Sequence, residues 1–134
     1  MRFSDSLKKN DDFKNVYKKG KSYANKYLVM YVLKNNKEVN RIGISVSRKV
    51  GNSVVRHRVT RLVRESYRLH ENIFNSGLDI VVIGRNNAKS ASYAEIESAL
   101  LHLGKLHHII KIFFYEVWFE NGYEKISDLL DSIL

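Results

Sequence analysis

The chain has 134 residues, which is the usual size of one domain with a single hydrophobic core. Hydrophobic residues make up 44% and charged residues 28%, so the composition excludes a wholly disordered chain. The absence of cysteine excludes a disulfide framework, a thiolate nucleophile and any cysteine-ligated metal site. Lys and Arg number 23 against 14 Asp and Glu, and the net charge of +9 indicates a polyanionic partner.

The excess positive charge lies in the first two thirds of the chain. Residues 1–90 carry 20 basic and 7 acidic side chains, a balance of +13. Residues 91–134 carry 3 basic and 7 acidic side chains, a balance of −4. This asymmetry indicates a basic nucleic-acid-binding surface followed by an end that does not contact the polyanion.

No segment predicts export or membrane insertion. The first nine residues lack an apolar stretch of signal-peptide length, and the most apolar stretch, residues 109–119, is interrupted by Lys111 and Glu116. We therefore expect a soluble, cytoplasmic protein with no membrane partner and no small-molecule substrate.

The first half of the chain predicts one short helix and two strands. An Asx cap at Asn10 opens a helix of about three turns that ends at Gly20. Residues 27–33 are apolar on both faces of a strand, and residues 41–47 alternate as a second strand. A further strand is possible around Tyr23, without boundaries that the sequence can fix.

The second half predicts a long helix, a strand and another helix. Asn52 or Ser53 caps the long helix, which runs to about Phe74, and residues 79–84 form a buried strand. A capping box at residues 92–95 opens the last helix, whose apolar side carries Ile96, Leu100, Leu103 and Leu106.

The long helix separates an apolar arc from a basic one. With Arg56 as the zero of a helical wheel, the apolar arc falls between roughly 220° and 340° and the basic arc between roughly 80° and 140°. The apolar arc holds Val55, Val59, Leu62, Val63, Ser66 and Leu69; the basic arc holds His57, Arg61, Arg64 and Arg68. Arginines at i, i+3 and i+7 repel one another with only Glu65 beside them, and a planar guanidinium suits phosphate, so we expect a phosphate-binding face.

No catalytic motif is found. The chain lacks a phosphate-binding Gly-rich loop, a dinucleotide-binding loop and a zinc-protease helix. His102, His107 and His108 lie near one another in sequence, but no carboxylates stand at matching spacing, so surface or core roles are favoured. We assign no catalytic residue and no metal ligand.

Residues 49–64 resemble the signature helix of the bacterial ribonuclease P protein subunit. Segments in the same order around it also match that family: residues 7–13, 16–20, 24–25, 42–47 and 79–83. The resemblance covers about residues 5–110. It implies an α+β fold, a two-layer α/β sandwich of order αβββαβα with a left-handed βαβ crossover, similar to domain 2 of ribosomal protein S5. We therefore expect an RNA-binding domain over residues 1–110.

The resemblance also implies the partners. In that family a catalytic RNA with bound Mg²⁺ removes the 5′ leader of precursor tRNA, and the protein is a small non-catalytic subunit. Family positions that bind the RNA are matched by Arg48, Lys49, Arg56, His57, Arg58, Arg61, Arg64 and Arg68. His57 replaces the family's asparagine, and Thr60 stands where a lysine is common.

The family holds the single-stranded leader in a cleft between the first helix and the sheet. Phe13, Tyr17 and Tyr31 match its aromatic positions, and aromatic stacking binds single strands with little sequence preference. The spacing of Phe13, Val16 and Tyr17 by itself is more typical of a core, so the cleft is implied by the resemblance.

Residues 111–134 depart from the family as an aromatic and acidic extension. Docking on the domain, pairing with another chain and poor order are all open for this extension.

Two functions other than that of a ribonuclease P subunit are also open for the chain. A ribosomal-protein-like RNA-binding module would share the charge pattern, and a self-sufficient nuclease would use the histidines.

Overall fold

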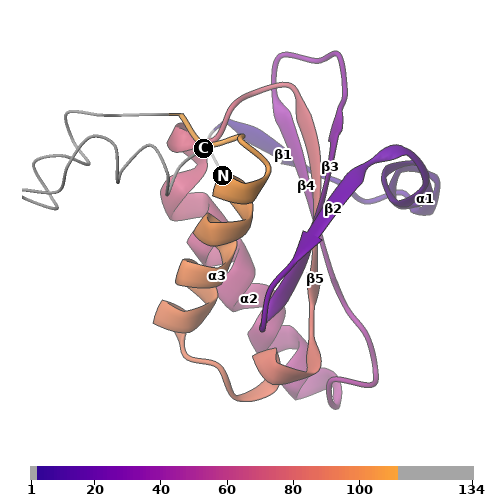
Figure 1. The fold of residues 1–134 in the computed structure, drawn as a ribbon. Helices are drawn as coiled ribbons and strands as arrows, with labels where there is room; N and C mark the ends of the chain where they lie inside the picture. The colour runs from indigo at the N-terminus through magenta and orange to yellow at the C-terminus, as the bar shows by residue number, and fades with distance from the viewer. Residues whose placement is uncertain (1–2, 112–134) are drawn as a thin grey trace, which may run out of the picture.

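The computed structural model describes residues 3–111, which form a five-stranded sheet and three α-helices (Figure 1). The elements in chain order are β1 Ser4–Ser6, α1 Asn10–Lys19, β2 Lys21–Ala24, β3 Leu28–Lys34, β4 Asn40–Val46, α2 Ser53–His70, β5 Leu78–Gly84 and α3 Tyr93–Leu106. Two short 3₁₀ turns, Glu71–Ile73 and Asn86–Ser90, precede β5 and α3 respectively. The mixed α+β fold expected from the sequence is confirmed.

The strand order is β1-β4-β5-β3-β2. β5 lies at the centre, parallel to β4 and antiparallel to β3, and the β4–α2–β5 segment connects two neighbouring parallel strands. Six of the seven residues of β5 are buried, which explains its nearly uninterrupted apolar sequence. The strand expected around Tyr23 is β2, which pairs with β3 in antiparallel register.

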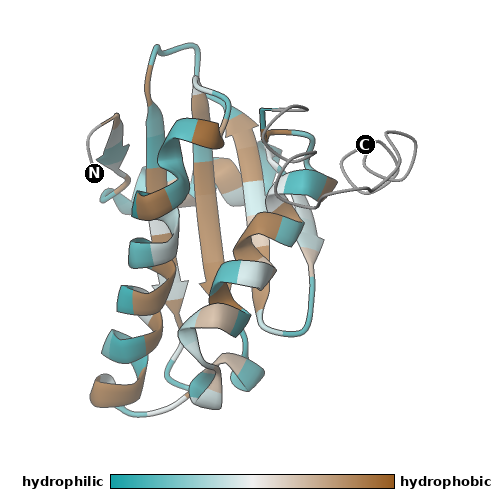
Figure 2. Cartoon of the chain, turned by 90° about the vertical axis from the view of Figure 1, so that its left-hand side faces the viewer, coloured by the Kyte–Doolittle hydropathy of each residue, from teal (hydrophilic) through white to brown (hydrophobic). Residues whose placement is uncertain are grey.

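Helices cover both faces of the sheet. α2 and α3 lie against one face and α1 lies on the other (Figure 1). Figure 2 views the α2–α3 face and shows hydrophobic central strands behind the two helices. The alternation along β3 fits this arrangement, because Leu28 and Met30 join the α2–α3 core while Tyr31 and Leu33 pack on the α1 side. Both faces of β3 are therefore covered, as its sequence predicts.

The buried side of α2 is rotated from the arc that the sequence favours. Tyr67 is fully buried, and its hydroxyl lies 2.8 Å from the hydroxyl of Ser4 and accepts a hydrogen bond from Asn40. Leu69, which the helical wheel puts on the packing arc, is instead 51% exposed. A tyrosine can be buried when its hydroxyl finds partners, which a wheel of hydrophobic residues does not reveal.

Several element boundaries differ from the sequence prediction. Asn10 is the first residue of α1 and not its cap, because the N-cap is Lys9 without a side-chain cap bond. α2 ends at His70 and continues as a 3₁₀ turn, so Phe74 lies beyond the helix. Asn52 caps α2 as expected, and the capping box of Ser92 is present at the start of α3.

β1 was not predicted by the sequence. This strand of three residues pairs in parallel with β4 at the edge of the sheet. Within residues 3–111, no helix has the length and apolar character needed to cross a membrane. The predictions for the C-terminal extension fall almost entirely on residues 112–134, outside the described residues.

Candidate nucleic-acid interface

One side of α2 carries basic side chains that point away from the sheet. We call His57, Arg61, Arg64 and Arg68 the arginine face; all four are exposed. The helix turns this face outward because Val59, Val63 and Tyr67 are fully buried on the opposite side. The structure therefore places the basic arc where the sequence predicts it.

The arginines of this face differ in their partners. Arg68 binds Glu65 through two hydrogen bonds, of 2.9 Å from Nε and 2.6 Å from Nη2. This pair lowers the pKa of Glu65 through the hydrogen bonds from Arg68, so the carboxylate stays charged. Among the described residues, Arg61 and Arg64 form no hydrogen bond or ion pair. These two guanidinium groups are free to bind an anion.

Arg58 is held by the protein itself. Its Nη2 donates to the carbonyl oxygen of Ala91 at 2.6 Å and its Nη1 to that of Lys89 at 3.3 Å. Arg58 therefore ties the start of α3 to α2, and because carbonyl oxygens are uncharged its positive charge remains uncompensated. The sequence predicted an RNA contact here and did not reveal this structural role.

The other basic residues predicted to bind RNA lie around the first turns of α2. Arg48 and Lys49 are exposed in the loop between β4 and α2. Arg56 is only partly exposed, and its buried Nε has no hydrogen-bond partner in the described structure. The structure thus gathers all the predicted RNA-binding residues on α2 and the loop before it.

A hollow of about 440 Å³ lies between α2 and the first turn of α3. We call it the α2–α3 hollow; its lining residues are Arg58, Arg61, Leu62, Arg64, Glu65 and Tyr93. Tyr93 was not among the residues predicted from the sequence. The sequence predicts that Tyr93 is the first residue of α3, because it directly follows the Ser92 cap. The sequence does not predict that α3 lies beside the arginine face.

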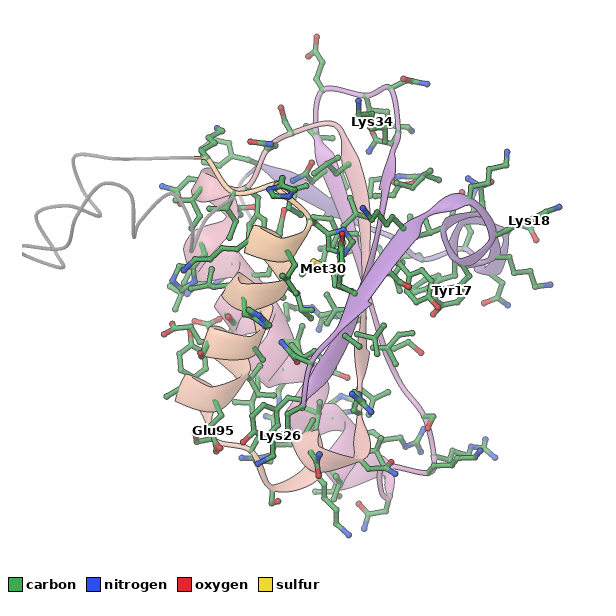
Figure 3. The ribbon with its side chains drawn as sticks, viewed as in Figure 1. Tyr17, Lys18, Lys26, Met30, Lys34 and Glu95 are labelled. Carbon is green, nitrogen blue, oxygen red and sulfur yellow. The ribbon has the colours of Figure 1, made fainter. Side chains whose placement is uncertain are left out.

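The opposite face of the sheet carries a second candidate site under α1. Phe13, Tyr17 and Tyr31 form a chain of rings, with centroid distances of 6.3 Å between the first two and 5.1 Å between the last two. Figure 3 shows Tyr17 on the sheet side of α1 and Lys18 on its outer side. The structure therefore brings together the three aromatic residues that match the cleft positions of the resembled family.

A groove of about 320 Å³ runs beside these rings. We call it the α1 groove; it is lined by Asn10, Phe13, Lys14, Tyr17, Ile44 and Ser45. Tyr17 is 38% exposed, so one part of its ring remains open to a ligand. Burial raises the pKa of Tyr17, and a hydrogen bond with Ser45 partly offsets this effect. Tyr31 supports the groove by packing against Tyr17 and does not line it directly.

Gly43 of β4 provides the space in which the ring of Phe13 lies. A Cβ atom at this position would stand 2.6 Å from Cζ and 2.8 Å from Cε1 of Phe13. Only glycine therefore allows the ring to rest directly on the strand. A glycine inside a strand often marks such a close approach, so this position could have been found from the sequence.

A network of ion pairs fixes α1 to the sheet. Arg41 of β4 binds the buried carboxylate of Asp79 at 2.6 Å and 2.8 Å, and its Nη1 lies 3.4 Å from Asp12 in the first turn of α1. Burial by itself would raise the pKa of Asp79, but hydrogen bonds from Arg41 and Asn35 outweigh it and hold the pKa below its usual value. The network was not predicted, because its members are far apart in sequence.

The histidines near the end of α3 have structural surroundings. Nε2 of His107 lies 2.8 Å from the carbonyl oxygen of Met30, and burial lowers the pKa of this imidazole. Nδ1 of His102 lies 3.2 Å from the amide of Asn25. Within residues 3–111, no three His, Asp or Glu side chains are grouped so that they could hold a metal ion.

Comparison with known proteins identifies the family of this chain. The family model described as Ribonuclease P matches residues 1–107. The ribonuclease P protein component of Lachnoclostridium phytofermentans is 66% identical over 107 residues, covering 80% of this chain and 92% of that protein. The ribonuclease P protein component of Alkaliphilus metalliredigens is 59% identical, covering 77% of this chain and 93% of that protein.

Solved structures show the same fold. The RNase P protein of Staphylococcus aureus is 38% identical with a TM-score of 0.74, covering 79% of this chain and 97% of that one. The RNase P protein of Thermotoga maritima is 34% identical with a TM-score of 0.69, covering 74% of this chain and 94% of that one. The family model, the curated relatives and the solved structures agree with the observed sheet and the arginine-rich α2. The chain therefore belongs to the family of ribonuclease P protein components, which are subunits of a tRNA-processing endoribonuclease.

Proposed function

We propose that this chain binds the catalytic RNA of ribonuclease P through α2, and the 5′ leader of precursor tRNA through the α1 groove. In this way it promotes the endonucleolytic cleavage that forms the mature 5′ end of tRNA. The observation that carries the proposal is the presence of two surfaces suited to RNA on opposite faces of one sheet. A protein with two such faces can contact the RNA subunit and the substrate at once.

The arginine face supports the contact with the RNA subunit. Arg61 and Arg64 have no protein partner among the described residues, so RNA phosphates can replace water around them without breaking an existing ion pair. Each phosphate neutralised releases counterions from the RNA, which strengthens binding at low salt. Exposed Arg48 and Lys49 extend the positive charge to the loop before the helix.

The α1 groove supports the contact with the leader. A single-stranded leader has unpaired bases, and their faces can stack on aromatic rings such as that of Tyr17. Lys14 lines the same groove and can neutralise a backbone phosphate. This combination of ring and cation binds single strands with little sequence preference, as a protein must when leaders differ from one tRNA to another.

The hydrolysis itself is assigned to the RNA. The described residues offer no cluster of metal ligands, and the histidines of α3 contact backbone or amide groups instead of a carboxylate pair. Mg²⁺ bound by the RNA would supply the activated water and stabilise the leaving oxygen. The role of this chain is to bind and orient, and the place of action is the cytoplasm.

Reconstitution with a bacterial ribonuclease P RNA tests the proposal. The chain should increase cleavage of precursor tRNA at low Mg²⁺ concentration relative to the RNA alone. Digestion of the RNA with micrococcal nuclease should abolish the activity. A ribosomal-protein-like binder would bind RNA without increasing cleavage, and activity that resists the nuclease would show that the protein carries its own active site.

A further inference from the structure

The α2–α3 hollow combines an aromatic side chain with a group of cations. Arg61 and Arg64 come from α2 and Tyr93 comes from the first turn of α3. The volume of about 440 Å³ is large enough to admit a nucleobase with its sugar. Such a mixture of ring and guanidinium groups differs from a purely electrostatic surface, because it offers a site for a base as well as for a phosphate.

The charge in this hollow is strongly positive. Arg58, Arg61 and Arg64 line it together with one acid, Glu65. Both carboxylate oxygens of Glu65 are bound by Arg68, so this acid does not neutralise the other three arginines. The hollow therefore favours an anionic ligand.

The protein holds Tyr93 in place beside the arginines of the α2–α3 hollow. Arg58 binds the carbonyl oxygen of Ala91, two residues before Tyr93, and the capping box of Ser92 and Glu95 fixes the first turn of α3. The hydroxyl oxygen of Tyr93 is buried near Ser66 and Glu97 and has no hydrogen-bond partner among the described residues. A ring whose hydroxyl end is enclosed by the protein loses little conformational freedom when a base stacks on it.

We infer that the α2–α3 hollow binds one unpaired nucleotide of the ribonuclease P RNA, with its base on Tyr93 and its phosphate on Arg61 and Arg64. The inference rests on the proposed binding of that RNA by α2 and extends the interface onto α3. Arg58 then acts as a positioning residue, since it holds Tyr93 beside the arginine face and adds a fixed positive charge. A nucleotide within a duplex would not fit this role, because its base faces are covered by neighbouring bases.

The test compares Tyr93→Leu with Tyr93→Phe in binding to a bacterial ribonuclease P RNA without tRNA. Tyr93→Leu removes the ring, and the affinity should fall by about 5- to 150-fold, the range for a lost base–aromatic stack. Tyr93→Phe keeps the ring and should retain most of the affinity. The slope of log K against log salt should not change in either variant, whereas Arg61→Ala should flatten it by about 0.7–0.9.

Three results would overturn the inference. In the first, Tyr93→Leu binds the RNA with wild-type affinity. In the second, Tyr93→Leu and Tyr93→Phe lose affinity equally. In the third, the slope of log K against log salt flattens in Tyr93→Leu as it does in Arg61→Ala. The last result would mean that Tyr93 only places the arginines. Failure of the proposed function is distinguishable, because then Arg61→Ala and Arg64→Ala would also leave RNA binding unchanged. Thermal melting of each free variant separates a lost contact from a lost fold.

Discussion

Arg41 and Asp79 form an ion pair that joins neighbouring strands at the centre of the sheet, with the Asp79 side chain only 3% exposed and that of Arg41 21% exposed. Arg41 also contacts Asp12 on α1, so one guanidinium connects the central strand, its neighbour and the helix above the groove. The orientation of α1, and with it the α1 groove, depends on a pair that lies outside the groove itself.

We predict that Arg41→Met lowers the free energy of unfolding by about 3–5 kcal/mol, because it leaves the buried carboxylate of Asp79 without its cation. Urea unfolding at neutral pH measures this loss. Arg68→Met is the matched control, since its pair with Glu65 has both side chains 48% exposed, and such a pair contributes about 0–1 kcal/mol. Equal losses in the two variants would show that the burial of Asp79 has no special energetic effect.

The same pair predicts a dependence of stability on pH. The pKa of Asp79 is lower in the folded chain than in the unfolded one, so its stabilisation is complete above the unfolded value of about 4 and is lost as pH falls through the folded value. Asp79→Asn should remove this part of the acid sensitivity. The comparison of urea midpoints at neutral and acidic pH checks it, and parallel curves for wild type and variant would contradict it.

Arg61→Ala and Arg64→Ala should weaken binding to the catalytic RNA and leave the thermal melting of the free protein nearly unchanged, because both side chains are exposed. Each lost phosphate contact should flatten the plot of log K against log salt by about 0.7–0.9. Arg58→Ala provides the contrast. It removes the hydrogen bonds to Ala91 and Lys89, so it should lower the melting temperature as well as the affinity. An unchanged salt slope with loss of the fold in Arg61→Ala would show a structural role instead.

Tyr17→Ala should weaken binding of precursor tRNA by about 1–3 kcal/mol, as expected when a base loses an aromatic partner. Tyr31→Ala should weaken it less, because Tyr31 packs against the ring of Tyr17 and does not line the groove. Binding of mature tRNA, which has no leader, should hardly change. The measurement is the affinity of the reconstituted enzyme for both tRNAs, with melting of the free protein as the control. A core role for these rings would instead cost roughly 3–5 kcal/mol of stability and reduce both affinities together.

Gly43→Ala should displace the ring of Phe13, because the new Cβ would lie 2.6 Å from its Cζ. We expect a loss of about 1–3 kcal/mol of stability from the overpacking, and weaker binding of the leader because the groove changes shape. The double variant Gly43→Ala, Phe13→Leu should recover part of the lost stability, since the smaller side chain leaves room for the methyl group. Strictly additive effects in this cycle would contradict the contact.

Short-range patterns in the sequence account for most of the local structure and for the exposed basic face of α2. The basic arc of α2 is exposed as predicted, because a helix with valines at i and i+4 must turn the remaining side to water. The cap at Asn52 and the capping box at Ser92 follow equally from short-range patterns. The grouping of Phe13, Tyr17 and Tyr31 came from the family resemblance, since helical spacing alone also fits a core.

Features that depend on contacts between distant segments are visible only in the folded chain. β1 is too short to leave a pattern in the sequence, and it forms because β4 offers it an edge for pairing. Arg58 is an arginine on the same helix as Arg61 and Arg64, and the sequence does not distinguish it from them. It has a structural role because the carbonyl oxygen of Ala91 lies within hydrogen-bond distance in the folded chain. The burial of Tyr67 depends on Ser4 and Asn40, and the place of Tyr93 depends on the packing of α3 beside α2. Periodicity describes which side of a helix is apolar, but the partners of a polar side chain are fixed only when the whole chain has folded.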